Sequence, residues 1–405
     1  MSPPEPASVA REHVDGRAAG PVTTIVDCSG VGPGGITRVL TEIVRHWPAG
    51  HRLELVAVPP AWAVPPGRDG DVIVLSGQSG GRARTIATAT AALRRATGHA
   101  SRGSGRESSG GSVRVLSLSP SLAIAGSRLP VTTVVHDLAF KLWPYGIPAA
   151  VRQYRRVSYA TAVRRSAHLI CVSARTRHDL SGVYGVPAAR TAVWHPGSDV
   201  DATGPGRLPA SLAEIQARGQ RYLAVAGHAA HKGVELAIDA LASDPRYVLA
   251  VLTGGQRIPE FEQAAAASPA AGRIVFLDRL SDEDYVAVVS GAAGFLMPSH
   301  FEGYGLPAAE ALRLGTPTVI SPDPALAEAT GGAAIQMDSW TGAALARALA
   351  RLTQASTVQV GTTERSRSRG VAEAPRELPA RRSWREATEE LSALVLGAPA
   401  APVLG

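Results

Sequence analysis

Two carboxylates on either side of a glycine loop are the part of the sequence best suited to chemistry. Glu302 and Glu310 lie eight positions apart, and Gly303 and Gly305 lie between them. Ionised carboxylates only accept hydrogen bonds, and a hydroxyl group is a donor that they hold well. If both side chains point into one cleft, this pair is suited to grip the hydroxyl groups of a sugar or a ribose.

The elements around the loop are expected to place it at the end of a buried strand. The apolar run 293–297 predicts a parallel strand, which ends at Pro298. Pro307 suits the first position of a helix, where no amide hydrogen is needed, and Gly315 is a C-terminal stop. Glu310 is therefore expected in the first helical turn.

The same loop is also suited to bind phosphate. Free backbone N–H groups at a helix start favour anions, and Gly303 and Gly305 would let the backbone approach the ligand closely. The plainer alternative is that Glu310 only complements the helix dipole and that Glu302 is a solvated loop charge.

The segment 302–317 resembles the Glu-x7-Glu signature of the retaining glycosyltransferases of family 4, which have the two-domain GT-B fold. The resemblance covers both glutamates, the Gly-Tyr-Gly-Leu-Pro between them and the Gly-Thr-Pro that follows. It implies that Glu302 contacts the donor sugar and that Glu310 binds the ribose of the donor nucleotide. It also implies donor contacts from the loop residues Gly303, Tyr304, Gly305 and Leu306.

The composition is that of a globular protein with two domains. The chain has 405 residues, of which 45% are hydrophobic and 19% are charged. No apolar run is long enough for a transmembrane helix. Residues 1–20 lack a hydrophobic signal core and are expected to form a disordered tail, so the cytoplasm is the expected location. The high alanine, arginine and proline content suggests a GC-rich bacterial source.

The formal net charge of +7 would suit an anionic donor or an anionic membrane surface, but scattered arginine explains it as well. We expect no nucleic-acid partner and at most a weak peripheral membrane contact.

Cys28 and Cys171 form neither a disulfide framework nor a metal-ligand cluster and are expected to be packing residues. Of 41 basic residues only Lys141 and Lys232 are lysine. The chain uses arginine at all other basic positions, and lysine differs from it because its charge is a compact point on a flexible stem. Both lysine positions are therefore candidates for function.

The N-terminal half opens with a strand, a glycine loop and a helix, which is typical of a doubly wound domain. The β-branched run 22–26 precedes the loop 28–35, and a helical pattern follows from Ile36 through Trp47. The glycines do not fit Gly-x-Gly-x-x-Gly, so no NAD site is expected. The loop resembles the first loop of GT-B enzymes, which implies donor contacts from Gly34 and Gly35; a tight turn without function is the alternative.

A second strand of this half, 131–135, ends in His136 and Asp137. Residues just past the carboxyl ends of parallel strands are where such sheets bind ligands. From the sequence alone, a buried structural histidine is the simpler interpretation. The resemblance instead places His136 beside the donor sugar as a catalytic residue. Asp137 and Lys141 are expected on the acceptor side of the cleft.

The C-terminal half begins with strand 222–226 and the loop 227–233. Lys232 matches the lysine that holds the donor diphosphate in the family, where its charge would offset the charge growing on the leaving group. The chain departs from the family pattern at His228, where an arginine is usual, and His231 lies nearby. Either histidine would serve as a phosphate clamp only if protonated.

These observations predict an α/β protein with the GT-B fold, in which two doubly wound, Rossmann-like domains face a cleft. The expected divisions are the tail 1–20, an acceptor domain over 21–195, a linker over 196–220, a nucleotide-sugar domain over 221–382, and a closing helix over 383–396 that crosses back to the first domain.

The expected function is transfer of a mannose- or glucose-like hexosyl group, with retention, from a nucleotide diphosphate sugar to a hydroxyl of a glycan, lipid or small molecule. The nucleotide sugar is a co-substrate, and no cofactor or metal is expected because Lys232 and the helix at Pro307 supply the charge. One alternative is an epimerase or phosphorylase of the same architecture. The other is a non-catalytic partner that binds a sugar nucleotide in support of another transferase.

Overall fold

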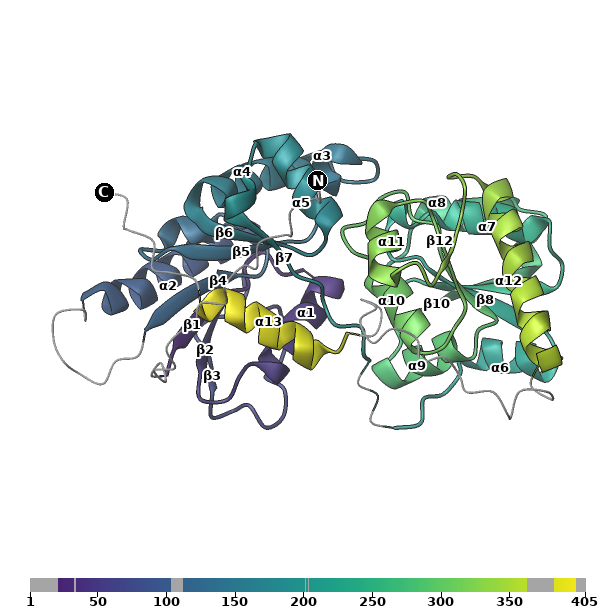
Figure 1. Ribbon diagram of the computed structural model, residues 1–405, viewed down its shortest axis with the longest axis horizontal. Helices are drawn as coiled ribbons and strands as arrows, with labels where there is room; N and C mark the ends of the chain where they lie inside the picture. Colours follow the sequence, from purple (N-terminus) through teal and green to yellow (C-terminus); the bar gives the residue numbers. More distant parts are fainter. Residues whose placement is uncertain are drawn as a thin grey trace, which may run out of the picture.

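The computed structural model describes residues 21–32, 34–102, 112–200, 202, 204–362 and 382–397, with the backbone alone for residues 99–102 and 354–362. The chain forms two lobes, and each lobe has a parallel sheet covered by helices (Figure 1). The expected tail 1–20 lies outside the described residues.

The first sheet has seven parallel strands in the order β3-β2-β1-β4-β5-β6-β7, so the chain reverses its direction of winding between β1 and β4. Its strands are β1 (Thr23–Asp27), β2 (Arg52–Val56), β3 (Val72–Val74), β4 (Val113–Ser117), β5 (Val131–Val135), β6 (Ser166–Cys171) and β7 (Thr191–Val193). Its helices are α1 (Gly35–His46), α2 (Arg82–Arg102), α3 (Ala139–Leu142), α4 (Ala149–Arg165) and α5 (Ala174–Tyr184).

The second sheet has six parallel strands in the order β10-β9-β8-β11-β12-β13, with the same reversal between β8 and β11. Its strands are β8 (Arg221–Ala226), β9 (Tyr247–Leu252), β10 (Ile274–Leu277), β11 (Gly294–Met297), β12 (Thr318–Ile320) and β13 (Ile335–Gln336). Its helices are α6 (Ala210–Ala217), α7 (Val234–Ala242), α8 (Pro259–Ala267), α9 (Asp282–Ser290), α10 (Leu306–Arg313), α11 (Pro324–Thr330) and α12 (Gly342–Thr362).

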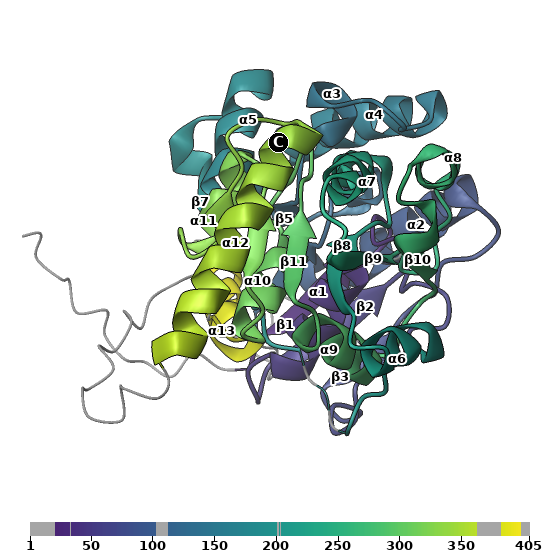
Figure 2. The ribbon, with the colours of Figure 1, turned by 90° about the vertical axis from the view of Figure 1, so that its right-hand side faces the viewer.

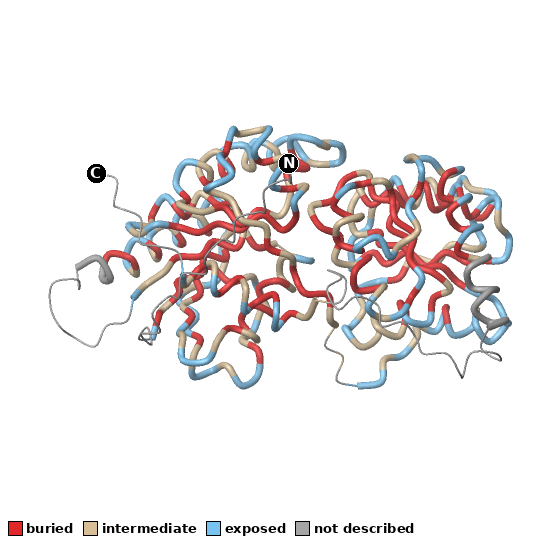
Figure 3. The backbone as a smooth tube through the Cα atoms, in the orientation of Figure 1, coloured by how far each residue is buried: buried red, intermediate tan, exposed pale blue. Residues whose placement is uncertain are grey.

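Both sheets form the buried centres of their lobes (Figure 3). Strands β5 and β9 are buried along their whole length, as expected where helices cover both faces of a parallel sheet. Figure 2 looks onto the second lobe, with α7 and α12 in front of its sheet. Cys28 and Cys171 are buried free thiols, in agreement with the prediction that they are packing residues. None of the described helices is both long and apolar enough to span a bilayer.

The last described helix, α13 (Trp384–Leu396), lies beside α1 on the first lobe (Figure 1). Ser383 caps its N-terminus in a capping box with Glu386, and Trp384 is buried in the core of the first lobe. The indole Nε1–H of Trp194 donates to the carbonyl of Ala387 over 2.7 Å. These contacts fix the C-terminal helix to the first lobe.

The connection between the lobes is shorter than the sequence pattern suggests. The segment 196–220 was expected to be a linker, but helix α6 occupies part of it. Leu212 of α6 is fully buried in the core of the second lobe, and together with the partly buried Ile215 it packs this short helix against β8. The segment was predicted to be a linker because polar residues, glycine and proline precede α6.

Candidate functional site

A buried ion pair lies at the reversal point of the second sheet. Lys232 ends the short 3-10 turn η4 (Ala230–Lys232) after β8, and Glu302 follows the neighbouring strand β11. The ammonium group of Lys232 donates to Oε1 of Glu302 over 2.7 Å, and both side chains are buried. Open parallel sheets bind ligands at this point, outside the carboxyl ends of the strands. Two predicted site residues are therefore brought together.

The loop that carries Lys232 is held against the loop of Glu302 by a glycine. Gly233 has φ +66°, and a Cβ at this position would lie 2.3 Å from the carbonyl oxygen of Pro298. Only glycine meets both requirements without strain. The backbone N–H of His300 also donates to the carbonyl oxygen of His231 over 2.8 Å. Tight packing of the two loops thus fixes the position of Lys232.

The histidines near Lys232 are neutral at physiological pH. Burial and the charge of Lys232 lower the pKa of His228 to about 3, and the same two causes lower the pKa of His231 to about 3. Neither imidazole therefore replaces the cation of the missing family arginine. In the part of this cluster that the structure describes, Lys232 carries the positive charge.

Glu310 is buried and contacts both lobes, but it lies just past the first turn of α10 and not within it as expected, because the helix already begins at Leu306. The hydroxyl of Tyr285 donates to its Oε2 over 2.8 Å. Nε of Arg38, from α1 of the first lobe, lies 3.5 Å from its Oε1. Burial raises the pKa of Glu310, while Arg38 and Tyr285 oppose this effect. The carboxylate is thus held where a ligand between the lobes would meet it.

Arg38 connects three parts of the chain. Besides Glu310, its guanidinium lies 3.5 Å from Oδ1 of Asp282 and donates to the carbonyl oxygen of Asp199 over 3.3 Å. Sequence reasoning missed Arg38 because it is one of several arginines on an amphipathic helix. It missed Tyr285 for a similar reason, since a single tyrosine in a helix most often packs in the core.

His136 lies at the carboxyl end of β5 in the first lobe, opposite the glutamate loop. Its Nε2–H donates to the carbonyl oxygen of Leu118 over 2.8 Å, and burial lowers its pKa. The imidazole is therefore neutral, with the proton on Nε2 and a lone pair on Nδ1. Asp137 accepts from the backbone N–H of Ala139 over 2.8 Å and lies 3.9 Å from a guanidinium nitrogen of Arg155.

The glutamate loop touches the first lobe through Gly303. A Cβ at Gly303 would lie 1.8 Å from the carbonyl oxygen of His136. The hydroxyl of Ser173, the N-cap of α5, donates to the carbonyl oxygen of Gly303 over 2.6 Å, and Thr176 donates to the same oxygen over 3.1 Å. The close approach that we expected toward a phosphate is made here toward the backbone beside His136.

The remaining loop residues also lie at the boundary between the lobes. Gly305 has φ +112° and precedes α10. Leu306 packs against the core of the first lobe, and a Cβ on Gly35 would lie 3.9 Å from its Cδ1. Gly34 has φ +100° and open space around its missing Cβ. The two predicted glycine loops therefore face each other.

The side chains of Tyr304 and Lys141 contact other protein groups. The ring of Tyr304 is buried in the core of the first lobe and stacks on His195 with ring centres 5.7 Å apart, so it packs between the lobes. Lys141 is exposed, and its ammonium lies 5.2 Å from the ring centre of Tyr184, away from the cavity beside His136. Lys141 lies on the outer face of the short helix α3, which the sequence did not predict.

Asp323 is an unpredicted member of the site. It caps α11, accepts from the backbone N–H of Glu302 over 3.1 Å, and lies 3.5 Å from Arg175. Burial raises its pKa to about 6. The Asp-Pro pair indicated a helix start, but only the fold brings this carboxylate beneath Glu302.

We predict that Asp323 makes the protein less stable as the pH rises through the range 4 to 6. Its pKa is raised to about 6 in the folded state, so the stability that its protonated form contributes is lost over this range. Two pKa units correspond to about 3 kcal/mol. Urea unfolding of the wild type and Asp323→Asn at pH 4 and pH 7 checks this. The wild type should lose more stability than the variant, and equal losses would contradict the assignment.

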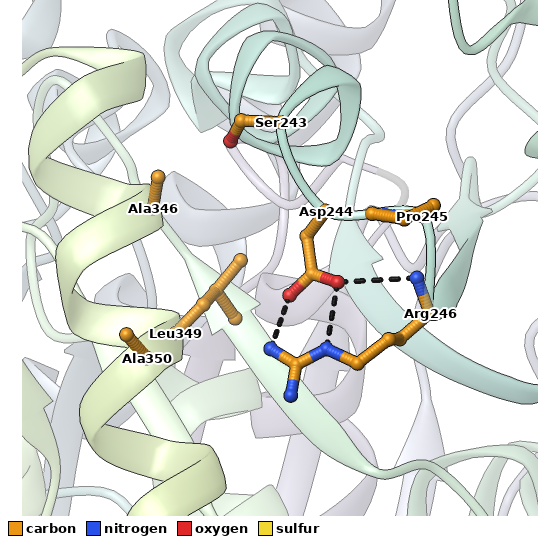
Figure 4. A pocket seen from close by; sticks show the side chains of 7 residues that line it. All are labelled: Ser243, Asp244, Pro245, Arg246, Ala346, Leu349 and Ala350. Atoms are coloured by element: carbon orange, nitrogen blue, oxygen red, sulfur yellow. Dashed lines mark hydrogen bonds and ion pairs between the residues drawn. The ribbon is translucent and has the colours of Figure 1, made fainter.

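A shallow hollow of about 390 Å³ lies far from these residues, between α12 and the turn before β9 (Figure 4). Among the described residues that line it, the only cation is Arg246, which makes a two-pronged ion pair with Asp244 at 2.9 and 2.7 Å. The hydroxyl of Ser243 donates to the carbonyl oxygen of Ala240 over 2.8 Å. Among the described residues, no three His, Cys, Asp or Glu side chains are grouped to hold a metal ion.

Comparison with known proteins agrees with this geometry. A family model described as "Glycosyl transferases group 1" matches residues 214–356, and one described as "Glycosyltransferase Family 4" matches residues 33–202. The O-antigen chain mannosyltransferase B of Escherichia coli is 27% identical over 256 residues, which span 55% of this chain and 66% of that protein. The D-inositol 3-phosphate glycosyltransferase of Nocardia farcinica is 28% identical over 209 residues, which span 47% of this chain and 46% of that protein.

Solved structures agree over almost the whole fold. WaaG, a glycosyltransferase involved in lipopolysaccharide biosynthesis, superimposes with a TM-score of 0.63 at 17% identity, covering 93% of this chain and 100% of that one. Anabaena Alr3699/HepE in complex with UDP and glucose superimposes with a TM-score of 0.62 at 16% identity, covering 93% of this chain and 99% of that one. The GT-B fold predicted from the sequence is confirmed. From its two family matches and its fold, the chain belongs to the family 4-like glycosyltransferases of GT-B architecture.

Proposed function

We propose that the chain transfers a hexosyl group, mannose- or glucose-like, from a nucleotide diphosphate sugar to an acceptor hydroxyl, with retention of configuration and without a metal ion. The observation that carries the proposal is the buried pair of Lys232 and Glu302, 2.7 Å apart at the reversal point of the second sheet. Its position suits a ligand with both a phosphate and a sugar hydroxyl.

In this proposal Lys232 contacts the donor diphosphate. The C1–O bond to the leaving phosphate breaks while a bond forms from C1 to the acceptor oxygen on the same face. The departing phosphate oxygen takes the acceptor's proton. Negative charge grows on that phosphate, and the ammonium of Lys232 together with the N-terminus of α10 stabilises it. Glu302 accepts from a hydroxyl remote from C1.

The first lobe supplies the other side of the reaction. His136 is neutral and holds its Nε2–H on Leu118, so its Nδ1 is able to accept from a sugar hydroxyl. The hexose assignment is supported by the name of one relative, an O-antigen chain mannosyltransferase.

Thermal unfolding with UDP, GDP, ADP, TDP and CDP, each with and without EDTA, tests the donor assignment. A ligand that binds only the folded state raises its stability by RT ln(1 + [L]/Kd). We expect one diphosphate to raise the Tm most, EDTA to leave that shift unchanged, and Lys232→Ala to lose it. A shift that EDTA abolishes would contradict metal independence.

A second candidate function is that of a sugar-nucleotide-binding partner without turnover. The observation that favours it is the neutral His228 at the position of a family arginine. Such a protein would show the same thermal shift but release no diphosphate from any nucleotide sugar, with or without acceptor.

We predict that Glu310→Ala weakens binding of the preferred nucleoside diphosphate by roughly ten- to a hundredfold, because a hydrogen bond to a charged group is worth about 1.5–3 kcal/mol. Tyr285→Phe is the matched control, since it removes one donor to Glu310 but leaves the carboxylate in place. Calorimetric titration measures both. Unchanged affinity in Glu310→Ala would show that the ribose contact is wrongly assigned.

A further inference from the structure

A cavity of about 620 Å³ opens beside His136, at the point where the first sheet reverses its winding. Its walls come from the loops after β1, β4 and β5, from the start of α2 and from α4. The volume lies within the range of sites that bind small molecules. Lys232, Glu302 and Glu310 are not among its lining residues but His136 is, so this compartment adjoins the donor site at His136.

The charged groups of this cavity are mostly positive. Its formally charged lining residues are Arg82, Arg155 and Asp137, and His136 is kept neutral by burial. Asp137 already accepts from the backbone N–H of Ala139. Asp27 lies beneath the cavity, fully buried, and the hydroxyls of Ser29, Ser117 and Ser121 donate to it.

Arg82 has the features of a ligand-binding cation. Its guanidinium carbon lies 4.5 Å from the ring centre of Tyr154, so the ring supports it from one side. Within the described parts of the chain, no carboxylate forms an ion pair with Arg82. The residue begins α2, and the backbone N–H groups of a first helical turn have no partner inside the helix.

Arg155 lies between this cavity and the donor site. Its contact with Asp137 is long, at 3.9 Å, and its side chain is 36% exposed. Its charge acts on the phenol of Tyr154 within the cavity and also on His231, next to Lys232. Arg82 stacks on the ring of Tyr154, Arg155 follows Tyr154 on α4, and all three residues line the cavity.

We propose that the acceptor carries a phosphate group and that Arg82 and Arg155 bind this phosphate in the cavity beside His136. The proposal rests on the proposed function, because it takes the ligand of this compartment to be the acceptor. Two guanidinium groups match a phosphate because each presents paired donors. A hydroxyl on the same molecule then reaches the edge of the cavity at His136, where the donor sugar is expected. The phosphate belongs either to a soluble sugar phosphate or to a lipid-linked sugar.

Binding to the full chain tests this proposal, with the preferred nucleoside diphosphate present at saturation so that the donor site is filled. The probes are inorganic phosphate, a hexose 6-phosphate, the same hexose without phosphate, and a short-chain prenyl-phosphate hexose. The variants are Arg82→Gln and Arg155→Gln. The controls are Arg95→Gln on α2 and Arg156→Gln on α4, which are exposed and do not line the cavity.

We expect at least one phosphorylated probe to bind at least tenfold more tightly than the free hexose. Each cavity variant should weaken that binding by about ten- to a hundredfold, as for lost bonds to a charged group, and each control should change it less than threefold. Tighter binding of the prenyl probe identifies a lipid-linked source, and tighter binding of the hexose 6-phosphate identifies a soluble one.

Equal binding of the free hexose and the phosphorylated probes, or phosphate binding that Arg82→Gln and Arg155→Gln leave intact, would overturn the proposal. The proposed function fails in a different way. If no nucleoside diphosphate raises the Tm, the glycosyl-transfer assignment is wrong, while binding of inorganic phosphate that depends on Arg82 and Arg155 would still show an anion site in this cavity.

Discussion

Lys232→Ala should lower kcat/KM for the preferred nucleotide sugar by about a hundred- to a thousandfold. The proposed role of Lys232 is to stabilise the charge that grows on the leaving diphosphate, and loss of one such group costs about this much in enzymes that use the same principle. The neighbouring His228 and His231 do not replace its charge, because their pKa values are lowered to about 3. Steady-state kinetics with a saturating acceptor measures the effect.

Loss of stability must be separated from loss of catalysis in this variant. Lys232→Ala leaves the carboxylate of Glu302 buried, at 7% exposure, without its partner, which is expected to cost about 3 kcal/mol. The double variant Lys232→Ala with Glu302→Gln removes that charge and should recover much of the stability but none of the activity. If the folded single variant keeps a kcat/KM within about threefold of wild type, Lys232 does not act on the leaving group.

Gly303→Ala should lower kcat/KM by about a hundredfold while it changes nucleotide affinity less than threefold. The added Cβ would lie 1.8 Å from the carbonyl oxygen of His136, so the glutamate loop must move away from the first lobe by more than an ångström. A displacement of this size at reacting groups costs about two orders of magnitude in rate. Nucleotide affinity is spared because Lys232 and Glu310 both belong to the second lobe.

Gly272→Ala is the matched control, since a Cβ at Gly272 meets no atom within 4 Å and its φ lies outside the left-handed region. Its kcat/KM and its Tm should stay close to those of the wild type. An active Gly303→Ala enzyme would mean that the contact between the glutamate loop and His136 is not needed during turnover. Equal losses of affinity and rate would place Gly303 in nucleotide binding.

Local patterns were sufficient to predict much of the architecture. The strands expected at 131–135 and 293–297 and the helix at Pro307 follow from β-branched or apolar runs and from proline, each of which acts over a few positions. Lys232 and Glu302 were expected in the donor site from the family resemblance, and the structure brings the two side chains into contact.

Contacts that join distant segments were not accessible in the same way. Arg38 meets Glu310 across 272 positions of sequence, and Asp323 lies under Glu302 only because β12 pairs with β11. Tyr304 was assigned to the donor from its place in the motif, but its ring points into the core of the first lobe. Which way a loop side chain faces depends on packing between the lobes, and no local pattern encodes that.

The most direct test of the central claim is the anomeric configuration of the product. The protein is incubated with EDTA, the nucleotide sugar whose diphosphate gives the largest thermal shift, and a panel of neutral and phosphorylated sugars, and the products are examined by NMR. We predict one glycoside whose anomeric configuration is that of the donor, formed by the wild type and not by Lys232→Ala. An inverted product would contradict the same-face mechanism, and absence of any glycoside despite nucleotide binding would identify a binding partner without turnover.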